Sequence, residues 1–330
     1  MFQTEPILAL QRNGWLHFPM WLTSELGYTH AFIVVVLAII YMVDFRKGFV
    51  IVQVIAWNGI FTDVFKGLFA LPRPDAVDSR VLLGGVEANP VPFEGMGAGG
   101  FLEPLPADVV SRYRSLGEFS FGFPSGHCSA TTSTWATIAL LFKRPDVRLI
   151  SAVLILLMPV SRMYLGRHFL ADVLGGVALG LLATTIGWLV IARSFDGRRS
   201  LNDWTRSLAP RREQLVRILY FFGLPLAAMA LPHADFGDCA RLLGINLAWT
   251  LVRRTGLPAS GGPPLRRLAR LGLAALSFLL VGFAASWLGT IAGFDDEQAE
   301  AAAYFAATLA TLWGTTELAI RMGLFPGRAG

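Results

Sequence analysis

The chain has 330 residues, of which 54% are hydrophobic and only 15% are charged. A soluble domain of this size carries about 25% charged residues. The apolar residues also form long runs, such as 174–192 and 271–291, which reach the length of about 18 residues needed to cross a bilayer. Composition therefore argues against a soluble protein. The two cysteines, Cys128 and Cys239, indicate neither a disulfide framework nor a structural metal site.

The N-terminal segment, residues 1–21, is expected to lie at the membrane interface because it contains Trp15, Phe18 and Trp21. It has no uninterrupted apolar stretch, so a cleavable signal peptide is not expected. Nine membrane segments are predicted after it, at roughly 22–43, 48–70, 125–142, 149–165, 168–192, 215–231, 238–252, 271–292 and 298–320. The predicted fold class is thus all-α, a polytopic membrane helix bundle.

Basic residues are concentrated in alternate connections between these segments. Seven arginines lie in 193–217 and five in 253–270, and with the smaller clusters they make 19 of the 28 basic residues on one side. The positive-inside rule then places the N-terminus outside and the C-terminus in the cytoplasm. The net charge of +5 is therefore interpreted as a topology signal, and nucleic-acid binding is not expected.

Four regions follow from this topology. They are the interfacial segment 1–21, a catalytic core at 22–192, a basic cytoplasmic loop at 193–214, and additional C-terminal transmembrane helices at 215–330. The core contains an outer loop, 75–120, that is rich in Gly, Pro and acidic residues. Loops of that length are usually functional or disordered.

The first chemical motif is Lys66, six residues, then Arg73-Pro74 at the outer end of the second segment. Seven residues make about two helical turns, so Lys66 and Arg73 are predicted to share a helix face. Pro74 would then stop the helix. Two fixed cations at a membrane surface suit a phosphate. Basic residues that only snorkel from a helix end are the alternative.

The second motif is Pro124-Ser125-Gly126-His127, directly before the third segment. Ser125 can cap the helix, and Gly126 lets the backbone approach a ligand closely. Free amide groups at a helix start form an anion site, and His127 can donate a proton to a leaving oxygen. An ordinary N-cap beside an interfacial histidine remains the alternative.

The third motif is Ser161-Arg162, five residues, His168, three residues, Asp172. His168 and Asp172 are four residues apart, which predicts that they share a helix face. The carboxylate can then fix the imidazole tautomer and leave the other ring nitrogen as a nucleophile. An aspartate this close to the membrane is costly unless it is paired, which favours a functional role over an incidental pair.

The order and spacing of the three motifs resemble the signature of the type 2 phosphatidic acid phosphatase superfamily, over residues 48 to about 190. The resemblance implies a metal-independent phosphatase without a cofactor. It implies that His168 is the nucleophile, that Asp172 orients it, and that His127 protonates the leaving group. It also assigns phosphate binding to five residues: Lys66, Arg73, Ser125, Gly126 and Arg162.

Four other polar residues lie outside the three motifs. Asp63 lies one turn before Lys66 and is expected to support it indirectly. His17, His30 and His233 are interpreted as interfacial or structural.

Several functions are compatible with this resemblance. A lipid phosphate or pyrophosphate in the bilayer is the favoured substrate, for example phosphatidate, phosphatidylglycerol phosphate or undecaprenyl pyrophosphate, because a site at the membrane surface admits an acyl chain laterally. The nine-segment layout is similar to the glucose-6-phosphatase branch, which would imply a soluble phosphomonoester. An inactive transport or lipid-interaction scaffold is a third alternative. The high Ala, Arg and Gly content suggests a bacterial source and hence the inner membrane. The charge pattern then places the active site on the periplasmic side, and the sequence identifies no protein partner.

Overall fold

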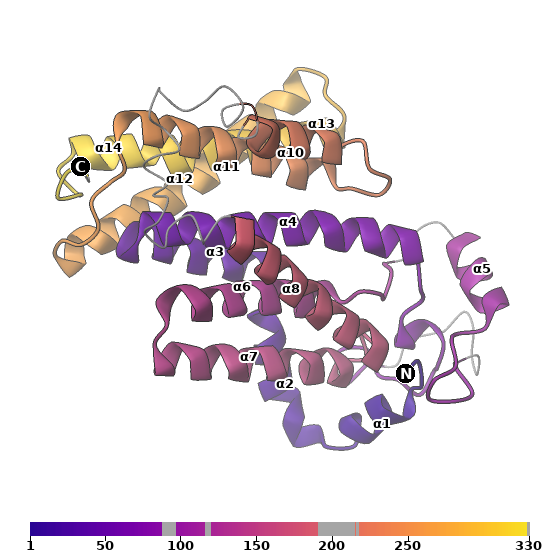
Figure 1. Ribbon diagram of the computed structural model, residues 1–330. Helices are drawn as coiled ribbons and strands as arrows, with labels where there is room; N and C mark the ends of the chain where they lie inside the picture. The colour runs from indigo at the N-terminus through magenta and orange to yellow at the C-terminus, as the bar shows by residue number, and fades with distance from the viewer. Residues whose placement is uncertain (88–96, 116–119, 191–214, 216–217, 329–330) are drawn as a thin grey trace. The chain divides into compact units, whose positions relative to one another are not determined.

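The computed structural model describes residues 1–87, 97–115, 120–190, 215 and 218–328 (Figure 1). Over these residues the chain forms helices and connecting loops and no β-strand, which confirms the all-α prediction. The predicted basic loop at 193–214 lies outside the described residues. The elements are α1 Glu5–Gln11, η1 Gly14–Leu16, α2 His17–Glu25, α3 Thr29–Ala38, η2 Ile39–Val43, α4 Phe45–Phe69, η3 Pro74–Ala76, α5 Ala107–Ser115, α6 Gly126–Phe142, α7 Pro145–Tyr164, α8 Leu170–Val190, η5 Leu219–Gly223, α10 Leu224–Ala228, α11 Phe236–Thr255, α12 Pro264–Ile291, α13 Asp296–Leu309, η6 Ala310–Thr315 and α14 Thr316–Arg321.

Over the described residues, each of the nine predicted membrane segments overlaps a helix or consecutive helices. Among the described residues, four stretches are long and apolar enough to span a membrane: Phe45–Ala76, Pro145–Tyr164, Leu170–Val190 and Pro264–Ile291. A fifth span results if Gly14–Glu25 and Thr29–Val43, which are bent by 56° relative to each other, count as one. The total of nine crossings stays a prediction.

The described chain divides into two compact units. The first comprises residues 1–32 and 61–186 and contains all three motifs, and the second comprises 33–60 and 187–330. In the first unit, α1, α2 and α6 all pack against α7 (Figure 1). In the second unit, α13 packs against both α11 and α12.

Close packing between α6 and α8 brings the second and third motifs together. A Cβ placed on Gly176 of α8 would lie 2.5 Å from the Ser125 carbonyl oxygen, and one on Gly180 would lie 2.6 Å from the Ser129 carbonyl oxygen. Any larger residue would meet backbone atoms, which cannot rotate away. The glycines therefore let the start of α6 approach the start of α8, where His168 and Asp172 lie.

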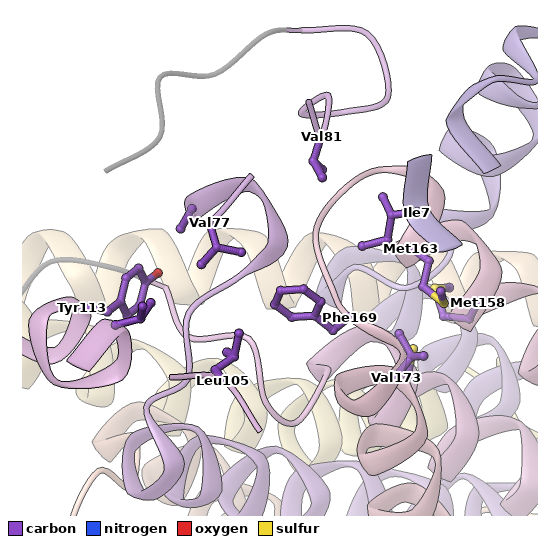
Figure 2. Close-up of a cluster of buried hydrophobic side chains, with 12 residues drawn as sticks. Ile7, Val77, Val81, Leu105, Tyr113, Met158, Met163, Phe169 and Val173 are labelled. Atoms are coloured by element: carbon purple, nitrogen blue, oxygen red, sulfur yellow. The ribbon is translucent and has the colours of Figure 1, made fainter. Parts of the chain in front are cut away.

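A hydrophobic cluster covers the end of the first unit that carries the motifs (Figure 2). Its buried side chains include Ile7 from α1, Val77 and Val81 from the loop after η3, and Tyr113 from α5. Phe169, directly after His168, is fully buried among them. Part of the predicted outer loop is thus packed in the same cluster as Phe169, the residue directly after His168.

Candidate active site

The first motif differs from its sequence prediction in one respect. Lys66 lies in the last turn of α4, but the helix ends at Phe69, before Arg73. Ala70 adopts a left-handed conformation (φ 44°), and Pro72 and Pro74 disfavour helical geometry in the residues before them. The prediction that Lys66 and Arg73 share a helix face is therefore wrong.

Arg73 is oriented by hydrogen bonds to Ser120 and not by a helix. Its backbone is extended (φ −91°, ψ 162°), and its guanidinium donates two hydrogen bonds to Ser120. Nε donates to the Ser120 carbonyl oxygen at 2.8 Å, and Nη2 donates to the Ser120 hydroxyl at 2.7 Å. Ser120, in the loop that leads into the second motif, thus orients this cation.

The second motif begins α6, as predicted, and Gly126 is its first residue. Ser125 occupies the N-cap position, but its side chain does not cap the helix, so that part of the prediction is wrong. Ser125 is instead buried, and its backbone N–H donates to the Asp172 carbonyl oxygen at 2.9 Å. A Cβ on Gly126 would lie 3.4 Å from the Lys66 ammonium nitrogen. Lys66 therefore adds positive charge where the free amide groups of α6 already favour an anion.

The third motif also differs in its local structure. The helix α8 begins at Leu170, so His168 lies in the loop before it and not on the helix. Asp172 is in the first turn, and its Oδ2 accepts a hydrogen bond from the Phe169 N–H at 2.9 Å. A third-position acid that bonds the N-cap amide is half of a capping box. This bond ends the loop and directs Oδ2 toward the histidine.

The predicted His168–Asp172 pair is nevertheless present. The distance from His168 Nδ1 to Asp172 Oδ2 is 3.5 Å, and the side chains are 2% and 0% exposed. At that distance the two groups interact electrostatically, but the separation is slightly too long for a good hydrogen bond. It favours the tautomer with the proton on Nδ1, which leaves the Nε2 lone pair free.

Three cations surround His168. Burial lowers the pKa of His168 well below 6.5, and the charges of Arg73, Arg162 and Lys66 lower it further. The imidazole is therefore neutral at physiological pH, the state that a nucleophile requires. The same neighbours would attract a phosphate dianion.

Arg162 completes the cationic group from the end of α7. It is 5% exposed, and its Nη1 donates a hydrogen bond to the hydroxyl of Ser24 at 2.6 Å. The neighbouring Ser161 hydroxyl donates to the Met20 carbonyl oxygen at 2.5 Å. Both bonds join the third motif to α2, a contact that the motif spacing does not predict.

The structure thus places every predicted site residue in one unit. Asp63 lies close enough to Lys66 to act on it electrostatically. His17 lies 6.4 Å from the ring of Tyr164, and His30 stacks on Tyr28 at 5.8 Å. The sequence interpretation missed Ser24, Gly27 and Tyr28, which contact Arg162 or His127. Their only sequence signal was a Gly-Tyr pair between two apolar runs. It also missed Arg167, whose charge acts on His127 and Arg162 and whose position directly before His168 was a usable signal.

Over the part of the chain that the structure describes, no three His, Cys, Asp or Glu side chains gather as metal ligands. Metal independence stays a prediction. Positive charge at this site is supplied by side chains and helix amides.

The fold and site define a membrane-embedded helical protein that pairs a buried His–Asp couple with a cationic anion site. Residues 47–196 match the family model of the PAP2 superfamily. The recognition from the three motifs is thereby confirmed, whereas the glucose-6-phosphatase-like layout is not.

Two curated proteins resemble parts of the chain. Phosphatidylglycerophosphatase B of Bacillus subtilis is 40% identical over 74 residues, which cover 20% of this chain and 36% of the relative. Lipid A 1-phosphatase of Rhizobium johnstonii is 31% identical over 142 residues, which cover 42% of this chain and 50% of the relative. The chain thus spans half or less of the length of these relatives. No solved structure matches the chain significantly.

Proposed function

We propose that the protein is a metal-independent phosphatase of a lipid phosphate or pyrophosphate, acting through a phosphohistidine at His168. The observation that carries the proposal is the convergence of the three motifs. The Lys66 ammonium lies beside Gly126, the Ser125 amide bonds the Asp172 carbonyl, and Asp172 contacts His168. The names of the two relatives, both lipid phosphatases, support the same substrate class.

In the first step, the Nε2 lone pair of His168 attacks phosphorus. The bond from phosphorus to the ester oxygen breaks, and the leaving oxygen takes a proton from His127. The imidazole gains positive charge, which the Asp172 carboxylate stabilises from 3.5 Å. Lys66, Arg73 and Arg162 neutralise the charge on the three phosphoryl oxygens, with the α6 amides as further donors.

In the second step, a water molecule attacks the phosphohistidine. His127, now unprotonated, accepts a proton from that water and returns to its acid form. The phosphorus–nitrogen bond breaks, its electron pair returns to Nε2, and inorganic phosphate leaves. Each histidine ends in the state in which it began, so the cycle needs no cofactor.

We place the site on the periplasmic side of a bacterial inner membrane. The three motifs lie at the ends of α4, α6 and α8 that the charge pattern assigns to the outside. Substrates presented in the outer leaflet would then reach it laterally. A lipid is favoured because the site belongs to a unit whose helices α7 and α8 are long and apolar enough to span a membrane.

The test is phosphate release by the purified full chain in detergent, with EDTA present. Phosphatidate, phosphatidylglycerol phosphate, an isoprenyl pyrophosphate and glucose 6-phosphate are compared, and turnover of the lipid substrates is expected. His168→Ala should abolish turnover and the trapped phosphoenzyme, whereas His127→Ala should retain some turnover of aryl phosphates, whose leaving groups need little protonation. Activity in His168→Ala above a few per cent of wild type would refute the mechanism. Activity lost on chelation and restored by Mg²⁺ would refute metal independence.

A further inference from the structure

Residues 24–28, which form the end of α2 and the bend before α3, contact two of the proposed catalytic side chains. One contact is the hydrogen bond from Arg162 Nη1 to the Ser24 hydroxyl, at 2.6 Å. Both side chains are buried, with 2% exposure for Ser24 and 5% for Arg162. The guanidinium is planar and rigid, so a hydrogen bond that fixes one of its nitrogens restricts the orientation of the whole group.

The Nε atom of Arg162 is buried and has no hydrogen-bond partner among the described residues. A buried N–H of a charged group is costly unless something accepts its bond. A phosphate oxygen satisfies that need. The serine thus occupies one edge of the guanidinium and leaves another for the substrate.

The second contact encloses His127. The ring of Tyr28 meets the imidazole edge-on, with centroids 4.5 Å apart and an angle of 83° between the planes. On Gly27, a Cβ would lie 2.7 Å from Cδ2 of His127, so only glycine permits this approach. The His127 Nε2 atom is buried and has no hydrogen-bond partner within the described ranges, which leaves it available to a substrate oxygen.

We infer that this bend is a fourth element of the active site, in which Ser24 positions Arg162 while Gly27 and Tyr28 position His127. The inference rests on the proposed phosphatase function and adds to it residues outside all three motifs. Ser24, Gly27 and Tyr28 act through their neighbours and are positioning residues. Misplacement of a catalytic group by about 1 Å costs roughly 100-fold in rate, so contacts of this kind affect turnover strongly.

The serine is tested through phosphate binding, with orthovanadate as the probe. Ser24→Ala removes the hydroxyl, and Ser24→Thr is the matched variant that keeps it. Loss of a hydrogen bond to a charged group predicts an inhibition constant for vanadate raised about tenfold or more in Ser24→Ala. Ser24→Thr should stay within about threefold of wild type.

The tyrosine is tested through the leaving group. Tyr28→Leu removes the ring that packs on His127, and Tyr28→Phe keeps it. Because His127 protonates the leaving oxygen, Tyr28→Leu should lower kcat about tenfold or more for an alkyl phosphate. It should lower kcat much less for p-nitrophenyl phosphate, and Tyr28→Phe should resemble wild type with both substrates.

These outcomes distinguish a failure of the inference about the bend from a failure of the proposed phosphatase mechanism. A merely structural role would lower kcat equally for both leaving groups and would leave the vanadate constant of the folded fraction unchanged, and either result overturns the inference. If Ser24→Ala does not fold, the Tyr28 pair decides, since Tyr28 is 40% exposed and its replacement is expected to leave the fold intact. The proposed function fails independently if His168→Ala retains activity.

Discussion

The Asp172 carboxylate offers the sharpest test of the nucleophile's environment. Replacement by asparagine keeps the shape of the side chain. It also keeps an oxygen that can accept the hydrogen bond from the Phe169 N–H, which in the native protein lies 2.9 Å from Oδ2. It removes the negative charge beside Nδ1 of His168. The substitution therefore changes the electrostatics of the site and leaves the start of α8 intact.

The size of the effect follows from the geometry. At 3.5 Å from Nδ1 to Oδ2, an effective dielectric constant of about 20 gives roughly 4.7 kcal/mol between full charges. If about half a charge develops on the imidazole in the transition state, the loss is roughly 2.4 kcal/mol. We therefore expect Asp172→Asn to lower kcat by at least about 50-fold, and up to about 3000-fold for a full charge.

The assay is steady-state phosphate release on phosphatidate, combined with acid-quench trapping of the radiolabelled phosphoenzyme. Asp146→Asn is the control, because Asp146 is an exposed carboxylate at the start of α7 that accepts a hydrogen bond from Nη2 of Arg144 at 2.7 Å. It should retain full activity. If Asp172→Asn kept more than half of the wild-type kcat while His168→Ala was inactive, the stabilising role of Asp172 would be wrong.

Three further outcomes are expected. In a chain without its native cysteines, Ala98→Cys should react with an impermeant maleimide on intact spheroplasts, whereas Gly197→Cys should react only after lysis; the reverse pattern would overturn the orientation. Gly176→Ala should destabilise the protein by about 1–3 kcal/mol through overpacking and lower its unfolding temperature, whereas Gly272→Ala, with nothing within 4 Å of the new Cβ, should not. The hydrogen bond from Arg80 holds the pKa of Asp78 at about 2. The stabilising contribution of the ionised Asp78 is therefore present above pH ~4 and is lost as pH falls through about 2. In Asp78→Asn, the unfolding temperature should not show this part of the decrease at low pH.

The local departures from the sequence prediction have a common cause. Periodicity placed Arg73 and His168 on helices, because helical spacing was the only local geometry that brings residues seven or four apart together. In the structure α4 ends at Phe69 and α8 begins at Leu170. Arg73 is instead oriented by Ser120, and His168 by the buried loop before α8. Spacing identified residues that the structure brings together, but the loop geometry that holds them depends on distant partners.

The sequence by itself determined the helical class, the long apolar helices and the eight motif residues, because hydropathy and motif spacing are local properties of the chain. Only the tertiary structure decided how those residues meet. The approach of Gly176 to the Ser125 carbonyl, and of Lys66 to Gly126, joins elements that lie far apart in the chain. The same holds for Ser24 and Arg162, which are 138 residues apart. No periodic pattern encodes such pairs, because they depend on which helix faces pack together, and close packing is a property of the assembled core.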